Sequence, residues 1–361
     1  MATVLSTALA AFALAFAVTL LLLWILRRSA SALGLLDRPG GHKQHAMPVP
    51  AVGGLAIAVG VGAGLCLQTQ SFEGAVAAIL SAALAMLVVG LVDDRSGLSA
   101  RLRLLAQLLA ALWMVAAAGV LLHDFGPLFG GSQVLNLGLW SWPWTLFAVV
   151  GVINACNMSD GLDGAAATLL ALALVGLLVL GGAPSAYLPL IVALLGGLLG
   201  FLCWNAPLFG PARVFLGDAG SLSLGCVLAA LLVSMSQGEA RAFPPAAGLW
   251  LYALPLIDTV SVMWRRLAER RSPFQPDLRH FHHLLLRAGW SVRAAWAVQS
   301  SLAGLGVLVA VLGSRWQLPS SLLAGSFVGL ALLHHGVMRH ADQHGRLLGR
   351  PLQTQSHLDR D

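Results

Sequence analysis

The stretch Asn154-Ala-Cys-Asn157-Met-Ser-Asp160-Gly-Leu-Asp163-Gly164 lies between two long apolar runs. Two carboxylates and two carboxamides stand where a membrane helix would end. Asn154 and Asn157 would share one helix face, and the two glycines favour a turn beyond them. Asp163 could simply cap the following helix. Four such groups in ten residues exceed what capping requires, so we predict that this stretch forms part of a binding or catalytic site.

The composition is that of a membrane protein. Of the 361 residues, 58% are hydrophobic and 10% are charged, whereas soluble domains carry about 25% charged residues. So few charges cannot solvate a soluble fold, and we therefore predict an all-α polytopic membrane protein. Its four cysteines lie in or beside apolar runs without a C-x-x-C pair, which predicts neither disulfides nor a zinc site.

Hydropathy predicts about eleven membrane spans, each near the ~20 residues that cross a bilayer core of ~30 Å. These spans are roughly 4–26, 52–68, 74–92, 102–122, 143–159, 164–181, 186–204, 219–235, 245–264, 292–312 and 321–338. We expect residues 1–338 to form a single transmembrane catalytic domain and 339–361 to form a loosely ordered cytoplasmic tail. Arg27 and Arg28 follow the first apolar run instead of preceding it, which indicates a retained helix and not a cleaved signal peptide.

The basic residues orient these spans. If the N-terminus is outside, 19 of the 21 Lys and Arg residues fall in inner loops, and only Arg241 and Arg315 fall outside. The positive-inside rule therefore predicts an outer N-terminus and a cytoplasmic C-terminus. Because the basic residues follow the membrane topology, their excess does not indicate nucleic-acid binding.

Two further inner loops carry acids. Asp93 and Asp94 close a predicted helix, where the negative end of the macrodipole makes them unfavourable unless a cation is near. Arg95 and Arg101 could supply it, or a divalent cation such as Mg²⁺, which binds one or two carboxylates together with substrate phosphates. In Phe215-Leu-Gly217-Asp218-Ala-Gly220-Ser221, Asp218 could cap the helix 219–235 or hold a metal beside an anion at that helix N-terminus.

The remaining inner loops are basic. Lys43 and His45 lie in a Pro/Gly-rich loop that could meet phosphate or acidic lipid, or could be an ordinary positive-inside loop. Arg265-Arg266 and His280-Phe-His282-His283 could bind phosphate or act in acid–base chemistry; a zinc site and a solvated basic face are the alternatives. Asp258 lies inside a predicted span, where a charge costs ~2.5–3.5 kcal/mol, so we expect it to be near the interface, paired or protonated.

Taken together, these motifs resemble the polyprenyl-phosphate N-acetylhexosamine-1-phosphate transferase family, over about residues 34–290. The motifs that carry the resemblance are Val92-Asp93-Asp94, Asn154-x-x-Asn157-x-x-Asp160-Gly-Leu-Asp163-Gly164, Phe215-Leu-Gly-Asp218-Ala-Gly-Ser221 and His280-Phe-His282-His283. The loop from Arg265 to Gly289 is most similar to the WecA-type branch, although Phe281 replaces the usual Ile between the histidines.

The resemblance implies transfer of GlcNAc-1-phosphate from UDP-GlcNAc to undecaprenyl phosphate, with release of UMP, at the cytoplasmic face of a bacterial inner membrane. It leaves open other UDP-N-acetyl sugars, UDP-MurNAc-pentapeptide and a homodimer. A lipid-phosphate phosphatase and a lipid-linked transporter are the rival classes. Direct attack by the acceptor needs only positioning and charge stabilisation, while a two-step route through an aspartyl-phosphate stays open.

The resemblance also implies roles for individual residues. Asp218 would bind Mg²⁺, with Mn²⁺ as an alternative, and Asp93 and Asp94 would lie nearest the reacting phosphates and the metal, with Asp93 as the base. The uracil pocket would be formed by Lys43, Phe215 and Asp163, and Asn157 and Asp160 would lie around the diphosphate. His280, His282 and His283 would lie at the diphosphate or sugar end, with His280 acting in catalysis and the other two in substrate binding. The remaining residues expected to bind substrate are His45, Asn154, Arg265 and Arg266.

Overall fold

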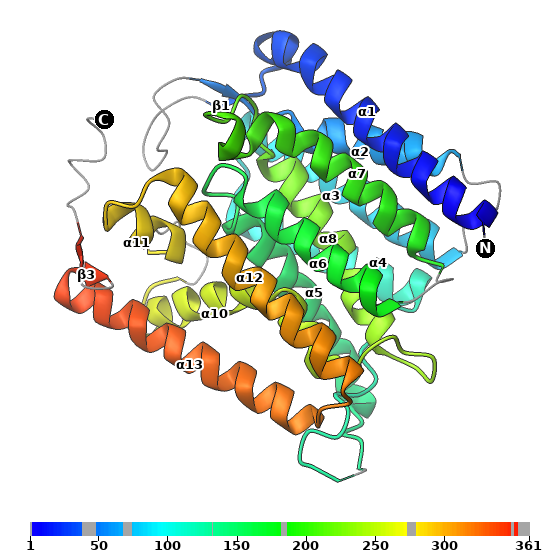
Figure 1. Ribbon diagram of the computed structural model, residues 1–361, viewed down its shortest axis with the longest axis vertical. Helices are drawn as coiled ribbons and strands as arrows, with labels where there is room; N and C mark the ends of the chain where they lie inside the picture. Colours follow the sequence, from blue (N-terminus) through cyan, green and yellow to red (C-terminus); the bar gives the residue numbers. More distant parts are fainter. Residues whose placement is uncertain are drawn as a thin grey trace.

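A computed structural model describes residues 2–37, 48–67, 74–131, 133–181, 186–272, 279–347 and 350–352, and these residues are mostly helical, with very little sheet (Figure 1). The α-helices are α1 (Ala2–Leu33), α2 (Gly53–Leu65), α3 (Gly74–Ser96), α4 (Ala100–Ala118), α5 (Ser141–Met158), α6 (Ala165–Gly181), α7 (Leu188–Asn205), α8 (Gly217–Ser236), α9 (Pro245–Leu251), α10 (Ala253–Ala268), α11 (Phe281–Arg287), α12 (Val292–Arg315) and α13 (Ser320–His344). Short 3₁₀ turns cover Gly138–Trp140 and Pro207–Phe209. Two short antiparallel pairs join β1 (Leu36–Asp37) to β2 (Val49–Pro50) and β3 (Arg346–Leu347) to β4 (Arg350–Pro351).

The predicted fold class, an all-α polytopic membrane protein, is confirmed. Within the described ranges, eight helices are long and apolar enough to cross a membrane, or nine if α9 and α10 count as one bent span. The apolar helices α2 and α6 are shorter, and each of the predicted spans coincides with one of these helices or with the bent pair. The exact number of crossings and their orientation stay predictions.

One predicted span, 245–264, is broken. The axes of α9 and α10 differ by 85°, and the fully buried Tyr252 occupies the break between them. Pro255 explains why one straight helix cannot continue, because proline has no N–H to donate to the carbonyl of Leu251. In the first turn of a new helix that missing donor has no cost.

Helix α8 forms the centre of the bundle, and nearly all of its residues are buried (Figure 1). Its small residues let neighbouring backbones approach closely. At Gly90 of α3, an added Cβ would lie 2.3 Å from the Cα of Ala219, and at Gly54 of α2 it would lie 2.2 Å from the backbone nitrogen of Gly220. The first turn of α8 is therefore enclosed by α2 and α3 at positions that only glycine permits.

A short backbone ladder holds α2 to the segment before α8. The backbone N–H of Phe215 donates to the carbonyl of Pro50 at 2.8 Å, and the N–H of Gly53 donates back to the carbonyl of Phe215 at 2.9 Å. The N–H of Gly54 donates to Leu216 in the same way. These bonds attach the segment at the start of α2 to the start of α8.

The C-terminal region is packed, which corrects the expectation of a loosely ordered tail for its described part. Helix α13 continues past residue 338 to His344, and β3 and β4 follow it (Figure 1). Met338, Ala341 and Leu347 are buried in an apolar cluster with Leu284 and Leu285 of α11. The sequence of this region is polar overall, but these three apolar residues are buried together with α11.

Candidate active site

Asp94 caps the central helix α8. Its Oδ1 accepts the backbone N–H of Asp218 at 2.8 Å, and its Oδ2 accepts that of Ala219 at 3.1 Å. The N-cap position itself is held by Leu216, which makes no side-chain capping bond. The interpretation of Asp218 as the N-cap was therefore wrong: an aspartate from α3, more than a hundred residues earlier in the chain, binds these free amides.

Asp93 forms an ion pair with Arg103, and not with the nearer Arg95 or Arg101 that the sequence suggested. Its Oδ2 accepts from Nη1 of Arg103 at 2.9 Å, and its Oδ1 accepts the backbone N–H of Leu98 at 2.5 Å. Arg103 lies in the second turn of α4, whose N-cap is Ser99. Arg95 and Arg101 were the predicted partners; the loop 97–99 turns the chain back so that Arg103 reaches Asp93 instead.

The same guanidinium reaches the next predicted metal ligand. Nη1 of Arg103 lies 3.7 Å from Oδ2 of Asp218. On its other oxygen, Asp218 accepts from the Asn157 amide at 2.5 Å, and Asn157 also donates to the hydroxyl of Ser221 at 2.9 Å. The predicted motifs at the ends of α3, α5 and α8 are thus joined into one polar cluster by side-chain contacts.

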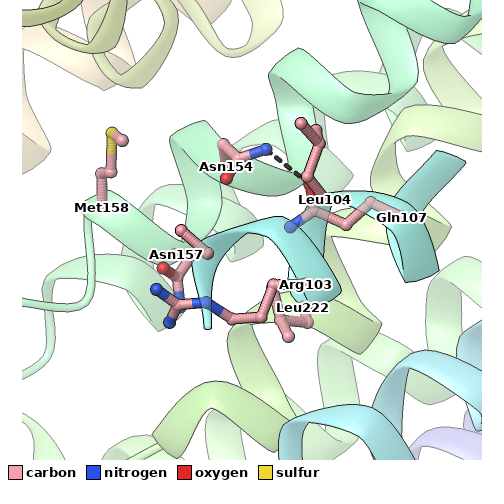
Figure 2. A pocket seen from close by; sticks show the side chains of 8 residues that line it. Arg103, Leu104, Gln107, Asn154, Asn157, Met158 and Leu222 are labelled. Carbon is pink, nitrogen blue, oxygen red and sulfur yellow. Dashed lines mark hydrogen bonds between the residues drawn. The ribbon is translucent and has the colours of Figure 1, made fainter. Parts of the chain in front are cut away.

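A pocket of about 50 Å³ opens beside this cluster, between α4, α5 and α8. Figure 2 shows Asn154 and Asn157 on α5 near Gln107 and Arg103 of α4. The Asn154 amide donates to Oε1 of the buried Gln107 at 2.7 Å and to the carbonyl of Val150 at 2.8 Å. As predicted, the two asparagines share a face, and that face lines a pocket.

The turn after α5 contains the two remaining acids of the opening stretch. Burial raises the pKa of Asp160 well above its ordinary value, and the negative charges of Asp218 and Asp94 raise it further. Oδ2 of Asp163 accepts the backbone N–H of Ala212 at 3.0 Å. The N–H of Gly164, at the start of α6, is bound by Asn205 at 2.8 Å. Asp163 thus connects this turn to the segment before α8.

The histidine motif lies against the acidic turn. An added Cβ at Gly161 would lie 2.3 Å from Nε2 of His282, and that nitrogen is buried without a hydrogen-bond partner. Burial lowers the pKa of His282 well below its ordinary value, and the neighbouring His283 and His280 lower it further. The rings of His282 and His283 lie 4.1 Å apart, and those of His280 and His282 are stacked at 5.9 Å.

Asp258 binds this motif from α10. Its Oδ2 contacts Nδ1 of His280 at 2.8 Å, and its Oδ1 accepts the backbone N–H of Phe281 at 3.0 Å. Nε2 of His334, on α13, contacts the same Oδ1 at 3.2 Å. Asp258 is buried and paired, as the membrane setting led us to expect.

The predicted arginines have structural partners. Arg265 is buried and forms an ion pair with Asp342 of α13, and its Nη2 donates to the carbonyl of Arg279 at 2.6 Å. Arg266 is also buried. The assignment of both arginines to substrate binding stays a prediction. The contact of Arg265 with the carbonyl of Arg279 favours a structural role, in which Arg265 holds the backbone just before His280. Lys43 and His45 lie outside the described residues.

The carboxylates were also predicted to hold Mg²⁺. Among the residues that the structure describes, no three His, Cys, Asp or Glu side chains are grouped to hold a metal. Asp93 and Asp218 nevertheless present oxygen donors to one cationic group, the Arg103 guanidinium, and a Mg²⁺ ion needs only one or two carboxylates besides phosphate oxygens. Oδ2 of each member of this pair faces a side-chain cation whose place Mg²⁺ could take, whereas both oxygens of Asp94 accept backbone N–H groups of α8.

Fold and site together define a polytopic helical membrane protein with an acidic cluster at the ends of α3, α5 and α8, and a histidine motif packed beside it. A family model for glycosyl transferase family 4 matches residues 76–236. The undecaprenyl-phosphate alpha-N-acetylglucosaminyl 1-phosphate transferase of Yersinia pestis is 32% identical over 93% of this chain and 92% of its own.

Two further relatives match over most of their length. The Escherichia coli K12 protein of the same name is 32% identical over 81% of each chain. A probable undecaprenyl-phosphate N-acetylglucosaminyl 1-phosphate transferase of Bacillus subtilis is 33% identical over 78% of each chain. The chain therefore belongs to glycosyl transferase family 4.

Proposed function

We propose that this protein transfers GlcNAc-1-phosphate from UDP-GlcNAc to undecaprenyl phosphate and releases UMP. The observation that carries the proposal is its similarity, over 93% of the chain, to a relative named for this transfer. A second support is the charge arrangement, in which Arg103 and several carboxylates meet at one end of the bundle. A third is the hydropathy of the chain, since a polyprenyl acceptor is reached from within a membrane.

In the proposed reaction, an oxygen of the acceptor phosphate attacks the phosphorus that carries the sugar. A new P–O bond forms, the P–O bond to UMP breaks, and UMP leaves with the bonding electron pair. Both substrates are anionic, so the main task of the site is to bring negative groups together and to stabilise the charge on UMP. The guanidinium of Arg103 can do this beside the carboxylates. Asp93 is our candidate for the group that accepts the proton of a singly protonated acceptor.

The donor would lie across the inner ends of the helices. We assign Asn157 and Asp160 to the diphosphate and Asp163, Phe215 and Lys43 to the uracil end. Asp93 and Asp218 are the residues that would hold Mg²⁺, which when bound supplies positive charge to the phosphate oxygens. Its replacement by Mn²⁺ and the formation of a homodimer are further proposals.

We further propose that the protein lies in a bacterial inner membrane with this site facing the cytoplasm. The support is the 19-to-2 distribution of basic residues about the predicted spans. The nucleotide sugar is a cytoplasmic metabolite in this arrangement, and the product would begin a cell-surface glycan such as an O-antigen.

The test uses the purified chain in detergent with UDP-GlcNAc, undecaprenyl phosphate and Mg²⁺, and it measures UMP. We expect UMP to appear only when both substrates are present, in equal amount to undecaprenyl-diphosphate-GlcNAc. UMP release without the acceptor would indicate hydrolysis, and release of inorganic phosphate from undecaprenyl phosphate would indicate a phosphatase; either result would refute the proposal. Parallel assays with other UDP-N-acetyl sugars and UDP-MurNAc-pentapeptide decide the donor.

A variant tests the assignment of the metal. We expect Asp218→Asn to abolish Mg²⁺-dependent UMP release in a protein that stays folded. Near-normal turnover in this variant would refute the assignment of Asp218 as a metal ligand without affecting the proposed reaction.

A further inference from the structure

Three helices, the consecutive α10 and α11 and the more distant α13, meet at the carboxylate of Asp258. This side chain lies on α10, just beyond the 85° break, and it is buried. It is bonded to Nδ1 of His280, which is the N-cap residue of α11, and to the backbone N–H of Phe281. It is also bonded to Nε2 of His334 on α13. A buried carboxylate is tolerated only when it is hydrogen-bonded in this way.

The two bonds from Asp258 to the start of α11 restrain His280 in two ways. The bond to Phe281 holds the backbone at the N-terminus of α11, where a free N–H needs an acceptor. The bond to Nδ1 holds the imidazole ring itself. A ring bound through one nitrogen presents the other in a defined direction. Nδ1 is the ring nitrogen engaged by Asp258, and the side chain is 6% exposed, so Nε2 is the nitrogen through which His280 could bind a ligand.

The other histidines of the motif have different surroundings. His282 is packed against Gly161, and its Nε2 is buried. Its environment disfavours the charged form, as the direction of its pKa shift indicates. His280 is thus held by a carboxylate through one ring nitrogen, whereas His282 is enclosed against Gly161.

Helix α13 contacts both Asp258 and the start of α11. His334 contacts Asp258, and its ring lies edge-on to Phe281 at 5.6 Å. Its neighbour His335 contacts the hydroxyl of Ser261 at 3.2 Å. His334 therefore supports the aspartate that holds His280, whereas His335 joins α13 to Ser261 of α10.

We propose that Asp258, supported by His334, is a positioning residue that orients His280 so that its Nε2 binds the diphosphate of the nucleotide sugar. The inference rests on the proposed function, because it names the residues that prepare one of its binding groups. In this proposal α13, which follows the acidic motifs in the sequence, contributes His334 to the support of Asp258.

The test compares kcat and KM for UDP-GlcNAc in single and double variants. We expect His280→Gln and Asp258→Asn each to raise KM by about tenfold, the effect expected from the loss of one hydrogen bond to a charged group. The double variant should be no worse than His280→Gln alone, because residues that act through one contact are not additive. Asp258→Glu should recover part of the lost affinity.

Ser261→Ala is the matched control, because it removes an α10–α13 contact that does not involve Asp258. We expect its KM to equal that of the wild type. If Asp258→Asn lowers only the amount of active protein and leaves KM unchanged, or if the double variant shows the product of the two single effects, the proposal is overturned.

His334→Gln keeps the proposal testable if Asp258→Asn does not fold. It should raise KM severalfold in the wild type and have no effect in the His280→Gln background; an equal effect in both backgrounds would overturn the proposal. A wild-type protein that releases no UMP refutes the proposed function itself, whereas a normal KM in an active, folded His334→Gln or Asp258→Asn variant refutes only the positioning role.

Discussion

The structure predicts that Asp94 and Asp218, two acids of one cluster, respond in opposite ways to the same substitution. Asp94 accepts the backbone N–H groups of Asp218 and Ala219 through its two oxygens. In Asp94→Asn, the amide oxygen can still accept one of these N–H groups, but the amide NH₂ group replaces the second carboxylate oxygen and cannot accept the other. One N–H at the start of α8 then loses its partner, and the helix terminus loses a favourable negative charge.

The magnitude follows from these two losses. An unsatisfied buried donor costs about 1–3 kcal/mol, and a charge at a helix N-terminus contributes about 0.3–1 kcal/mol. We therefore expect Asp94→Asn to lower the free energy of unfolding by about 2–3 kcal/mol. For a chain of this size that corresponds to a decrease of about 5 °C in melting temperature, estimated from about 2–4 °C per kcal/mol in smaller proteins.

Asp218→Asn is the matched control. Its remaining carbonyl oxygen can still accept from Asn157, and the loss of its charge relieves repulsion among the neighbouring carboxylates. We expect its melting temperature to be equal to or above that of the wild type, while UMP release is lost.

The assay is thermal unfolding of both purified variants in one detergent at one heating rate, since unfolding of membrane proteins is often irreversible. An Asp94→Asn protein as stable as the wild type would refute the capping role. A marked loss of stability in Asp218→Asn would refute the relief of repulsion.

Four further outcomes are expected. Gly161→Ala places a methyl group 2.3 Å from Nε2 of His282 and should destabilise the fold by about 1–3 kcal/mol in thermal unfolding; Gly62→Ala, with no atom within 4 Å, is the control. Because the pKa of His282 is lowered in the fold, the unfolded chain binds the proton more readily, and stability is lost as the pH falls below about 6.5; melting curves of His282→Gln should fall less steeply between pH 7 and 5. Asp342→Asn leaves Arg265 as a buried unpaired charge, so limited proteolysis should cleave the loop before α11 sooner. Chelation with EDTA should abolish UMP release, and added Mg²⁺ should restore it; full activity in EDTA would contradict the metal assignment.

The motifs of the candidate site could be predicted from the sequence because each follows an apolar helix on one side of the predicted membrane. Helix ends on one side of a bundle lie near one another, so the acids of α3, the asparagines of α5 and the start of α8 were expected to meet. The contacts from Asp93 through Arg103 to Asp218 and Asn157 confirm that proximity. The functional roles of these residues stay predictions.

The partners inside the cluster could not be predicted in the same way. Arg95 and Arg101 are closer to Asp93 in sequence, yet Arg103 binds it, because the turn before α4 decides which side of that helix faces α3. Asp218 is at the position typical of a cap, yet Asp94 provides the cap, because glycines at 54 and 90 let α2 and α3 close around the first turn of α8. Close approach of backbones depends on packing in three dimensions, which sequence spacing does not specify.

By itself, the amino-acid sequence determined the class of fold, the approximate positions of the helices and the side of the bundle on which polar groups gather, because hydropathy and charge act on each segment independently. Only the tertiary structure decided that α13 packs against the histidine motif and that Asp258 joins α10, α11 and α13. These features depend on contacts between residues as much as 76 positions apart, and such contacts arise when apolar faces of separate helices pack against each other.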